Sequence, residues 1–373
     1  MKGMREMVKI LCEGKKIKLK LEDNEKKSML ITGQSRMGKT FFASNLAAML
    51  AEDGYLVHLI DLGEKWGKED KKRLLDAGAV MQKAGSDGIN FVFRSAKELM
   101  GATRIIANAV CFQSENVNAV LQNTFRQLMD NGCNMWGMSD IVEILEEKMK
   151  ANNNGNEWEV KLHDRLNSFG IPNINLGTDT DQSFSGVSSI LELSGLDDTY
   201  VPIATYLFLF SLLCQQKRRW KNGSMKKGVF VIIDEFQNLE CDRKSIIGKC
   251  LTEGQKYKLN IILITQFLNG GFPDSVISQF KQGGYRFHFR LTEEEAAIVS
   301  RQIAYKQEVR KEIYQKLTFL PPGCCLMLGL HSVENRRDVS EQFRFVKIEE
   351  EVKIQSKCTN PFANYYGGKK VKK

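Results

Sequence analysis

The sequence predicts an α/β protein with a mainly parallel sheet, a helical insertion and a short N-terminal β-hairpin. Three observations carry this prediction. A strand, a loop of pattern G-x-x-x-x-G-K-T and a helix follow one another over residues 28–52; apolar strand-like runs return at 55–62, 189–193, 228–235 and 260–266; and helical patterns separate the runs. Strands that alternate with helices favour parallel pairing, because each crossover brings the chain back to the same end of the sheet.

The first strands are predicted before the loop. Residues 8–11 and 16–21 are short runs of apolar and basic side chains, and the second run alternates strictly. Glu13-Gly14-Lys15 between them favours a turn, so we expect a hairpin. The complete division is a β-hairpin (1–27), the first part of the α/β core (28–75), a helical insertion (76–185), the second part of the core (186–348) and a basic C-terminal tail (349–373).

The insertion is predicted because the apolar residues change from strand-like runs to helical spacing. Residues 116–129 place apolar side chains on one helical face, Ser139 is placed to cap a second helix, and residues 158–169 favour a third. After the insertion, a helix is expected over 201–216, and a connection over 217–227 carries six basic residues and one tryptophan. That connection fits either a phosphate-contacting segment or a solvated loop, and its pattern leaves both open.

Composition limits the class of protein. Of 373 residues, 42% are hydrophobic and 27% are charged, and the formal charge of +9 mildly favours a polyanionic partner. None of the nine cysteines forms a C-x-x-C pair, which argues against a zinc site, and the sequence does not begin with a signal-peptide pattern. The longest apolar run, 201–214, is shorter than a membrane span. We therefore expect a cytoplasmic protein without direct membrane insertion.

The G-x-x-x-x-G-K-T segment predicts a phosphate-binding loop. Gly33 and Gly38 allow backbone N–H groups to close around a polyphosphate at the positive end of the following helix. Lys39 is placed to reach the β- and γ-phosphates, and the Thr40 hydroxyl to hold Mg²⁺. A glycine turn that matches by chance is the alternative, and the flanking strand and helix count against it. The predicted nucleotide-binding residues are Gly33, Gln34, Ser35, Arg36, Met37, Gly38, Lys39, Thr40 and Phe41.

Two later strands end in polar side chains. The strand over 228–235 ends in Asp234, a candidate Mg²⁺ ligand, and Glu235, a candidate for orienting or deprotonating the attacking water. The strand over 260–266 ends in Gln266, a candidate sensor of the γ-phosphate. Each has a simpler reading, a solvated strand end for the acids and a turn cap for the amide. Together with the phosphate loop they indicate a site for ATP and Mg²⁺.

Three runs resemble the HerA/FtsK superfamily of pumping ATPases, and particularly the HerA and TraG-like ATPases of conjugation and type IV secretion. They are residues 232–239, 253–257 and 262–266. Further segments resemble the same superfamily less specifically and in the expected order, so that the resemblance extends from roughly residue 5 to 348. Departures are Arg36 and Met37 where small residues are usual, and the lack of predicted membrane helices or of a full N-terminal barrel.

The resemblance implies a RecA-like core in a homo-hexameric ring, with ATP at subunit interfaces and DNA in the pore. It implies catalytic roles for Lys39, Glu235 and Gln266, and a cationic finger from a neighbouring subunit. Candidates for the finger are Arg286, Arg290 and Arg301. The expected function is an ATP-driven DNA translocase. The alternatives are a type IV secretion assembly ATPase that acts on proteins, with a membrane-bound secretion or conjugation partner, and a nucleotide-dependent switch.

Overall fold

The structure is a computed structural model of the chain. It describes residues 7–12, 15–21, 27–63, 65–84, 89–110, 114–131, 135–151, 156–168, 174–177, 186–224, 227–239, 245–268, 274–281, 284–333 and 341–347. The predicted tail over 349–373 lies outside these ranges. So do residues 152–155 of a turn that the sequence predicts over 152–156, and residues 178–185 of a polar loop that it predicts over 177–186.

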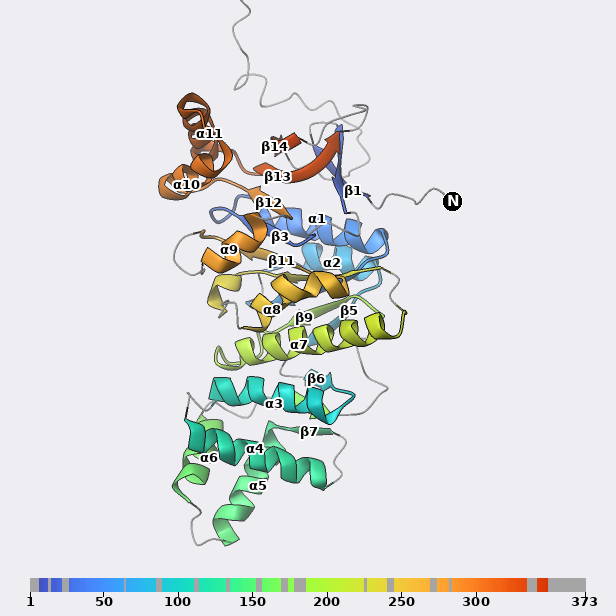
Figure 1. Ribbon diagram of the computed structural model, residues 1–373, viewed down its shortest axis with the longest axis vertical. Coiled ribbons are helices and arrows are strands. Elements are labelled where there is room, and N and C mark those ends of the chain that lie inside the picture. Colours follow the sequence, from blue (N-terminus) through green and yellow to red (C-terminus); the bar gives the residue numbers. More distant parts are fainter. Residues whose placement is uncertain are drawn as a thin grey trace, which may run out of the picture.

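A large mixed sheet forms the centre of the molecule (Figure 1). Neighbouring strands run parallel from one edge through the middle, and antiparallel strands continue the other side. The parallel strands in spatial order are β5 (Val80–Lys83), β9 (Ser189–Glu192), β4 (Leu56–Asp61), β10 (Val229–Ile233), β11 (Leu259–Thr265), β3 (Met29–Thr32) and β12 (Tyr285–His288). The antiparallel strands are β13 (Cys324–Val333), its partner β14 (Glu341–Lys347), and the hairpin of β2 (Lys15–Lys20) and β1 (Met7–Cys12).

Helices cover both faces of the parallel region, and β10 shows why. Every residue of β10 is buried; Phe230 and Ile232 join one apolar cluster, whereas Val231 joins the other. Each fully buried valine or isoleucine contributes about 1.5–3 kcal/mol, so a strand that is apolar on both faces is stable only between two layers. One layer contains α1 (Lys39–Glu52) and α2 (Lys68–Asp76), and the other contains α7 (Tyr200–Lys221) and α8 (Ile246–Glu253). The helix α3 (Ala96–Val110) packs on the far side of α7 (Figure 1). The mainly parallel α/β fold class is confirmed.

The inserted region packs beyond α7, at the lower end of Figure 1. It contains the helices α4 (Glu115–Asp130), α5 (Met138–Ala151) and α6 (Glu157–Ser168), and a small sheet of β6 (Ile89–Val92), β8 (Ile174–Gly177) and β7 (Met135–Gly137). The region predicted as helical is therefore mixed. Its first strand, β5, pairs with β9 at the edge of the main sheet, although the predicted boundary at residue 76 assigned it to the insertion. The domain boundaries themselves stay predictions.

Two helix ends differ from the prediction. The helix α7 continues to Lys221, so the basic run expected in a connection starts inside the last turns of α7. Lysine and arginine are good helix formers, and their charge is favourable at a helix C-terminus, which explains the extension. The predicted cap Ser139 lies inside α5; instead the Asp140 carboxylate accepts a hydrogen bond from the Gly137 N–H at 2.6 Å.

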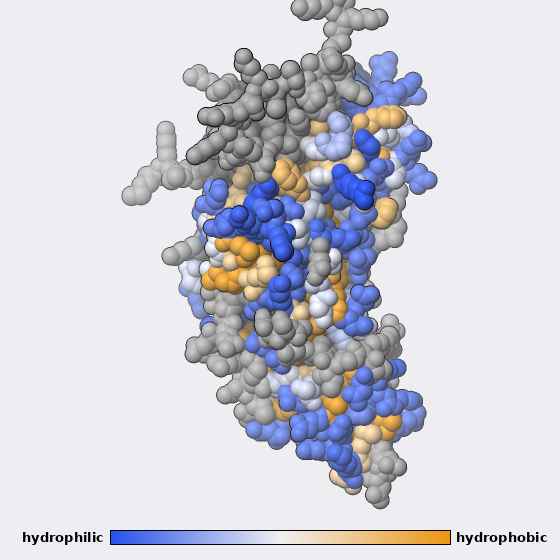
Figure 2. Space-filling view, turned by 180° about the vertical axis from the view of Figure 1, so that it is seen from behind, coloured by the Kyte–Doolittle hydropathy of each residue, from blue (hydrophilic) through white to orange (hydrophobic). Residues whose placement is uncertain are grey.

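The helix pair α10 (Glu293–Ile303) and α11 (Gln307–Phe319) lies near the antiparallel strands (Figure 1). The helix α9 (Asp274–Lys281) contacts α8, and the short 3₁₀ helices η1 (Phe236–Asn238) and η2 (Gly254–Tyr257) contact β11. Among the helices that the structure describes, none is long and apolar enough to cross a membrane. On the face in Figure 2, the coloured hydrophobic residues form separate patches among hydrophilic ones.

Candidate nucleotide-binding and hydrolysis site

The phosphate-loop sequence lies between β3 and α1, as predicted. Gly33 has φ +144° and Gly38 has φ +95°, conformations that residues with a Cβ atom rarely adopt. A Cβ atom on Gly33 would also lie 2.6 Å from the Cβ of Phe289. The loop is held from both sides, because the Gln34 N–H donates to the Arg290 carbonyl at 2.8 Å and the Gly323 N–H donates to the Met37 carbonyl at 2.9 Å.

The unusual loop residues Arg36 and Met37 are accommodated on its outer side. Arg36 is exposed and has a left-handed φ of 61°, a conformation that is uncommon outside glycine. Met37 and Phe41 are partly buried against the apolar cluster around α1, and the Arg73 guanidinium lies 4.8 Å from the Phe41 ring centroid. The Phe41 ring therefore lies against α2 in this structure.

The side chain of Lys39 turns into the curve of the loop. Its ammonium donates to the carbonyls of Gly33 at 2.7 Å and Gln34 at 2.9 Å, and the residue is only 8% exposed. Burial lowers the pKa of Lys39, while the negative charges of Asp234 and Glu235 oppose that shift. A buried ammonium inside a ring of backbone groups is stabilised by an anion, so the position fits a polyphosphate.

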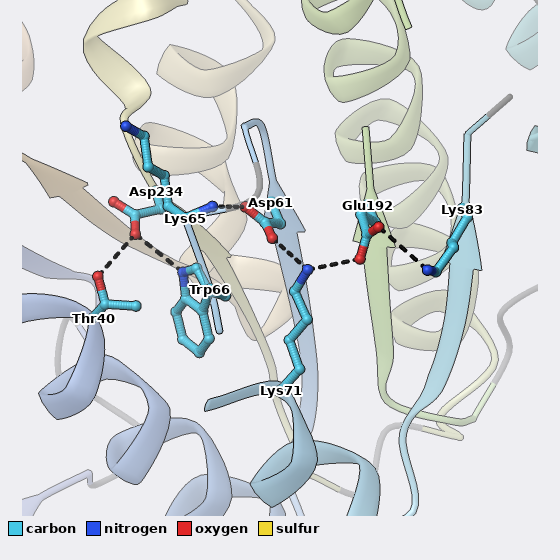
Figure 3. Close-up of polar contacts among 8 residues, drawn as sticks. All are labelled: Thr40, Asp61, Lys65, Trp66, Lys71, Lys83, Glu192 and Asp234. Carbon is cyan, nitrogen blue, oxygen red and sulfur yellow. Dashed lines mark hydrogen bonds and ion pairs between the residues drawn. The ribbon is translucent and has the colours of Figure 1, made fainter. Parts of the chain in front are cut away.

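Asp234, at the end of β10, lies across from Thr40. Its Oδ2 is 3.5 Å from the Thr40 hydroxyl and accepts a hydrogen bond of 3.0 Å from the Trp66 indole N–H (Figure 3). Its Oδ1 accepts the Glu235 backbone N–H at 2.8 Å. The carboxyl is buried, and burial raises its pKa to about 6, although the Glu235 N–H, the indole and Lys39 favour the ionised form.

This pair of oxygens fits a magnesium ion. Mg²⁺ prefers hard oxygen ligands in octahedral geometry, where adjacent ligand oxygens lie about 2.9 Å apart and opposite ones about 4.1 Å. The Thr40 and Asp234 oxygens are 3.5 Å apart, wider than the adjacent spacing, so a small rotation of the Thr40 hydroxyl would bring both oxygens into one ligand sphere. A cation would also relieve the burial cost that raises the pKa of Asp234. The residues present are therefore suited to holding Mg²⁺ beside a bound triphosphate.

Glu235 is held in a strained conformation by two amides. Its backbone has φ 55° and ψ 35°, which costs a residue with a Cβ atom about 1–2 kcal/mol. Gln266 Nε2 donates to Glu235 Oε1 at 2.6 Å, and Gln237 Nε2 donates to Glu235 Oε2. On its other side, Gln266 Oε1 accepts a hydrogen bond of 2.8 Å from the Ser35 hydroxyl in the phosphate loop. One amide thus joins the loop to the acidic residue.

Strand register explains why these groups meet. Thr32 of β3 pairs with Thr265 of β11, so Gly33 and Gln266 leave the sheet at the same level. Ile233 of β10 pairs with Leu263 of β11, which brings the acids to the same edge. The structure therefore brings together the phosphate loop, the acid pair and Gln266, as the motif spacing predicts. The catalytic roles of these residues stay proposals.

The three arginines occupy different places. Arg290 lies beside its own phosphate loop, and its Nε donates to the Leu320 carbonyl at 2.7 Å. Arg286 is on β12, with Nη1 3.5 Å from Gln302 Oε1 on α10, and burial lowers its pKa. Arg301 is exposed on α10.

Two hydrogen-bond partners of Asp234 and Glu235 were not predicted from the sequence. Gln237 comes two residues after Glu235, and its proximity in sequence was the only available signal. Trp66 reaches Asp234 from the segment between β4 and α2, far away in sequence, and no motif marks it.

No protein-family model and no curated protein matches the sequence. Solved structures do match. VirB4 of Thermoanaerobacter pseudethanolicus has a TM-score of 0.66 at 15% identity, covering 98% of this chain and 99% of that one. The bacterial conjugative coupling protein TrwBΔN70 has a TM-score of 0.59 at 14% identity, covering 92% and 89%. TrwB in complex with the ATP analogue ADPNP has 0.54 at 13%, covering 88% and 86%.

This chain has the VirB4/TrwB fold. The resemblance drawn from the sequence motifs is therefore confirmed at the level of the fold. The VirB4/TrwB fold includes the RecA-like core expected from the motifs. Identity below 25% extends the likeness no further than the fold.

Proposed function

We propose that this chain is an ATP-hydrolysing motor that moves DNA. The observation that carries the proposal is the Gln266 amide, which bonds both Ser35 of the phosphate loop and the Glu235 carboxylate. A protein that only bound a nucleotide would need neither an acid poised behind the loop nor an amide that links the two. A motor needs both, because loss of the γ-phosphate must change the conformation of the rest of the protein.

Each residue has a defined part in the proposed reaction. The loop N–H groups and Lys39 bind the phosphate oxygens, and Thr40 and Asp234 hold Mg²⁺, which neutralises charge on the β- and γ-phosphates when bound. Glu235 orients the attacking water and accepts its proton while the bond from the γ-phosphorus to the bridging oxygen breaks. Gln266 exchanges its bond with Ser35 or Glu235 for one with the γ-phosphate or with phosphate after cleavage.

Two variants test the hydrolytic site. Lys39→Ala should abolish ATP binding, whereas Glu235→Gln should bind ATP with wild-type affinity and hydrolyse it about 10²–10⁴-fold more slowly, as for loss of a general base. Lys72→Ala is the matched control, because Lys72 is exposed on α2. Equal steady-state rates in Glu235→Gln and wild-type protein would rule out the proposed role of Glu235.

A surface at the end of α7 supports DNA as the substrate. We call it the α7-end surface; it comprises Lys217, Trp220, Lys221, Lys256 and Tyr257. Trp220 is 48% exposed and lies edge-on to Tyr257, with ring centroids 6.5 Å apart. The ammonium groups of Lys217 and Lys256 lie 5.3 and 5.6 Å from the Tyr257 ring centroid. An exposed aromatic ring among lysines suits stacking on bases and contact with phosphates.

Nucleic-acid stimulation tests the substrate. ATPase rates should rise with single- or double-stranded DNA, and the double variant Trp220→Ala, Lys221→Glu should lose most of this increase without a change in basal rate. Lys72→Glu carries a matched charge reversal on α2. A wild-type rate that no DNA changes would contradict DNA translocation. If such a DNA-independent protein also co-purified with a secretion or pilus partner, the protein-translocating alternative would be favoured. If the protein did not hydrolyse ATP over multiple turnovers, a nucleotide-dependent switch would be favoured.

We also propose a homo-hexameric ring in which one subunit completes the site of its neighbour. If Arg286, Arg290 or Arg301 acts across an interface, its alanine variant should bind ATP but fail to hydrolyse it. Mixing that variant with Lys39→Ala subunits should then restore part of the rate, because some interfaces receive one intact half from each. No recovery for any of the three would exclude them as fingers.

A further inference from the structure

We propose that Trp66 is a positioning residue for Asp234, and that its hydrogen bond sets how tightly the site holds Mg²⁺ beside the nucleotide. The inference rests on the proposed function, since it concerns the same site. Trp66 touches neither nucleotide nor reacting atoms in this assignment. It acts through the orientation of the Asp234 carboxylate.

The hydrogen bond from Trp66 to Asp234 is buried. Trp66 is 2% exposed and belongs to the apolar cluster around α1, while its indole N–H reaches Asp234 Oδ2 at 3.0 Å. A buried indole needs an acceptor for its single N–H, and here the acceptor is the candidate metal ligand. Packing alone would be satisfied by phenylalanine, so the tryptophan supplies something that packing does not require.

The Asp234 carboxylate is held at both oxygens. The Glu235 N–H fixes Oδ1 and the indole fixes Oδ2, so both oxygens of Asp234 have a donor and the carboxylate plane is defined. Thr40 approaches the same Oδ2 from α1, on the other side from Trp66 (Figure 3). A carboxylate oxygen accepts more than one partner, and the arrangement keeps one lobe of Oδ2 directed to the space beside Thr40.

The segment that carries Trp66 is itself anchored. The backbone N–H of Lys65, the residue before it, donates to Asp61 Oδ1 at 3.1 Å. Asp61 is buried at the end of β4 and forms an ion pair of 2.7 Å with Lys71, which also pairs with Glu192 at 2.6 Å (Figure 3). The ends of β4 and β9 thus hold the start of the Trp66 segment, and a rigid support of this kind is what precise ligand placement needs.

The test separates Mg²⁺ binding from nucleotide binding. Trp66→Phe keeps the ring packing and removes the donor. With a non-hydrolysable ATP analogue bound, we expect the Mg²⁺ concentration at half-saturation to rise about tenfold, the effect of one hydrogen bond to a charged group, while analogue affinity without Mg²⁺ stays unchanged. Asp61→Asn, which loosens the anchor but keeps the indole, should give a smaller rise.

Intrinsic fluorescence gives a readout that does not depend on turnover. The chain has four tryptophans, and Trp66 is the one in contact with Asp234. Adding Mg²⁺ to the analogue complex should change the emission of wild-type protein and of Trp220→Phe, the matched control at the exposed end of α7. The change should be absent in Trp66→Phe.

The outcomes distinguish the two proposals. If wild-type protein binds Mg²⁺ and nucleotide but Trp66→Phe has the same Mg²⁺ half-saturation, the assignment of Trp66 is overturned and the proposed function stands. If Trp66→Phe loses Mg²⁺-free nucleotide affinity to the same extent as Mg²⁺ affinity, Trp66 is merely structural and the assignment is also overturned. If wild-type protein shows no response to Mg²⁺ and nucleotide, both proposals fail.

Discussion

Asp234→Asn is the perturbation whose size follows most directly from the structure. Burial raises the pKa of Asp234 from an ordinary 3.8 to about 6 in the folded, metal-free protein. The folded state therefore retains a proton between pH 4 and 6 that the unfolded state has already lost. The sign follows: as pH rises through this window, wild-type stability falls, because the folded protein must carry a buried charge.

The expected magnitude comes from the two pKa values. At pH 7.5 the buried charge costs about 3 kcal/mol, and at pH 4.5 about 1 kcal/mol. Asparagine carries no charge but has one oxygen in place of two, so it loses either the Trp66 or the Glu235 N–H bond, at about 1 kcal/mol, at every pH. The variant should therefore be about 2 kcal/mol more stable than wild type at pH 7.5, and about equal to it at pH 4.5.

Urea unfolding in EDTA, at several pH values between 4.5 and 7.5, measures this difference. Chelation removes any Mg²⁺ that would lower the pKa of Asp234, and the subtraction of wild type from variant cancels the titration of all other groups. If the stability difference between variant and wild type did not change with pH, Asp234 would not carry an unfavourably buried charge in the folded protein.

Three further predictions concern other parts of the site and core. Burial lowers the pKa of His58 to about 3, so the free energy of unfolding of the wild type should fall by up to about 1.4 kcal/mol per pH unit as pH drops below 6.5. His58→Gln should remove this contribution to the pH dependence of the free energy of unfolding. Gly33→Ala should abolish nucleotide binding in calorimetry, because the new Cβ would lie 2.6 Å from Phe289 at a position whose φ is already unfavourable. Gly78→Ala is the control: its φ is also positive but the space around it is open, so it should lower the free energy of unfolding by about 1 kcal/mol and bind nucleotide normally. Lys71→Met should lower the free energy of unfolding by about 3 kcal/mol, because it leaves two buried carboxylates without their shared cation; an unchanged denaturation midpoint would contradict the ion-pair assignment.

Features that depend on residues close together along the chain could be predicted from the sequence. The phosphate loop, the acids at 234 and 235 and the amide at 266 each follow a buried strand, and parallel strands end at a common edge. Their convergence was therefore predictable. The hairpin of β1 and β2 was predictable for the same kind of reason, since its alternation and turn are local.

Contacts that depend on packing between distant segments were not predictable. The bond from Trp66 to Asp234 spans 168 positions, and nothing in the residues around Trp66 indicates its partner. The strand β5 carries a weak pattern, Val80-Met81-Gln82-Lys83, and becomes a strand because β9 offers it an edge. The end of α7 was missed because a basic run was interpreted as a loop, although such residues favour a helix C-terminus.

The most direct test of the central claim is a multiple-turnover ATPase assay on Gln266→Ala, with and without DNA, beside a measurement of ATP affinity. Because the amide links Ser35 to Glu235, we predict unchanged ATP affinity, a turnover at least about tenfold slower, and no acceleration by DNA. Wild-type turnover with full DNA stimulation in this variant would contradict the claim that the amide couples the phosphate loop to the acid.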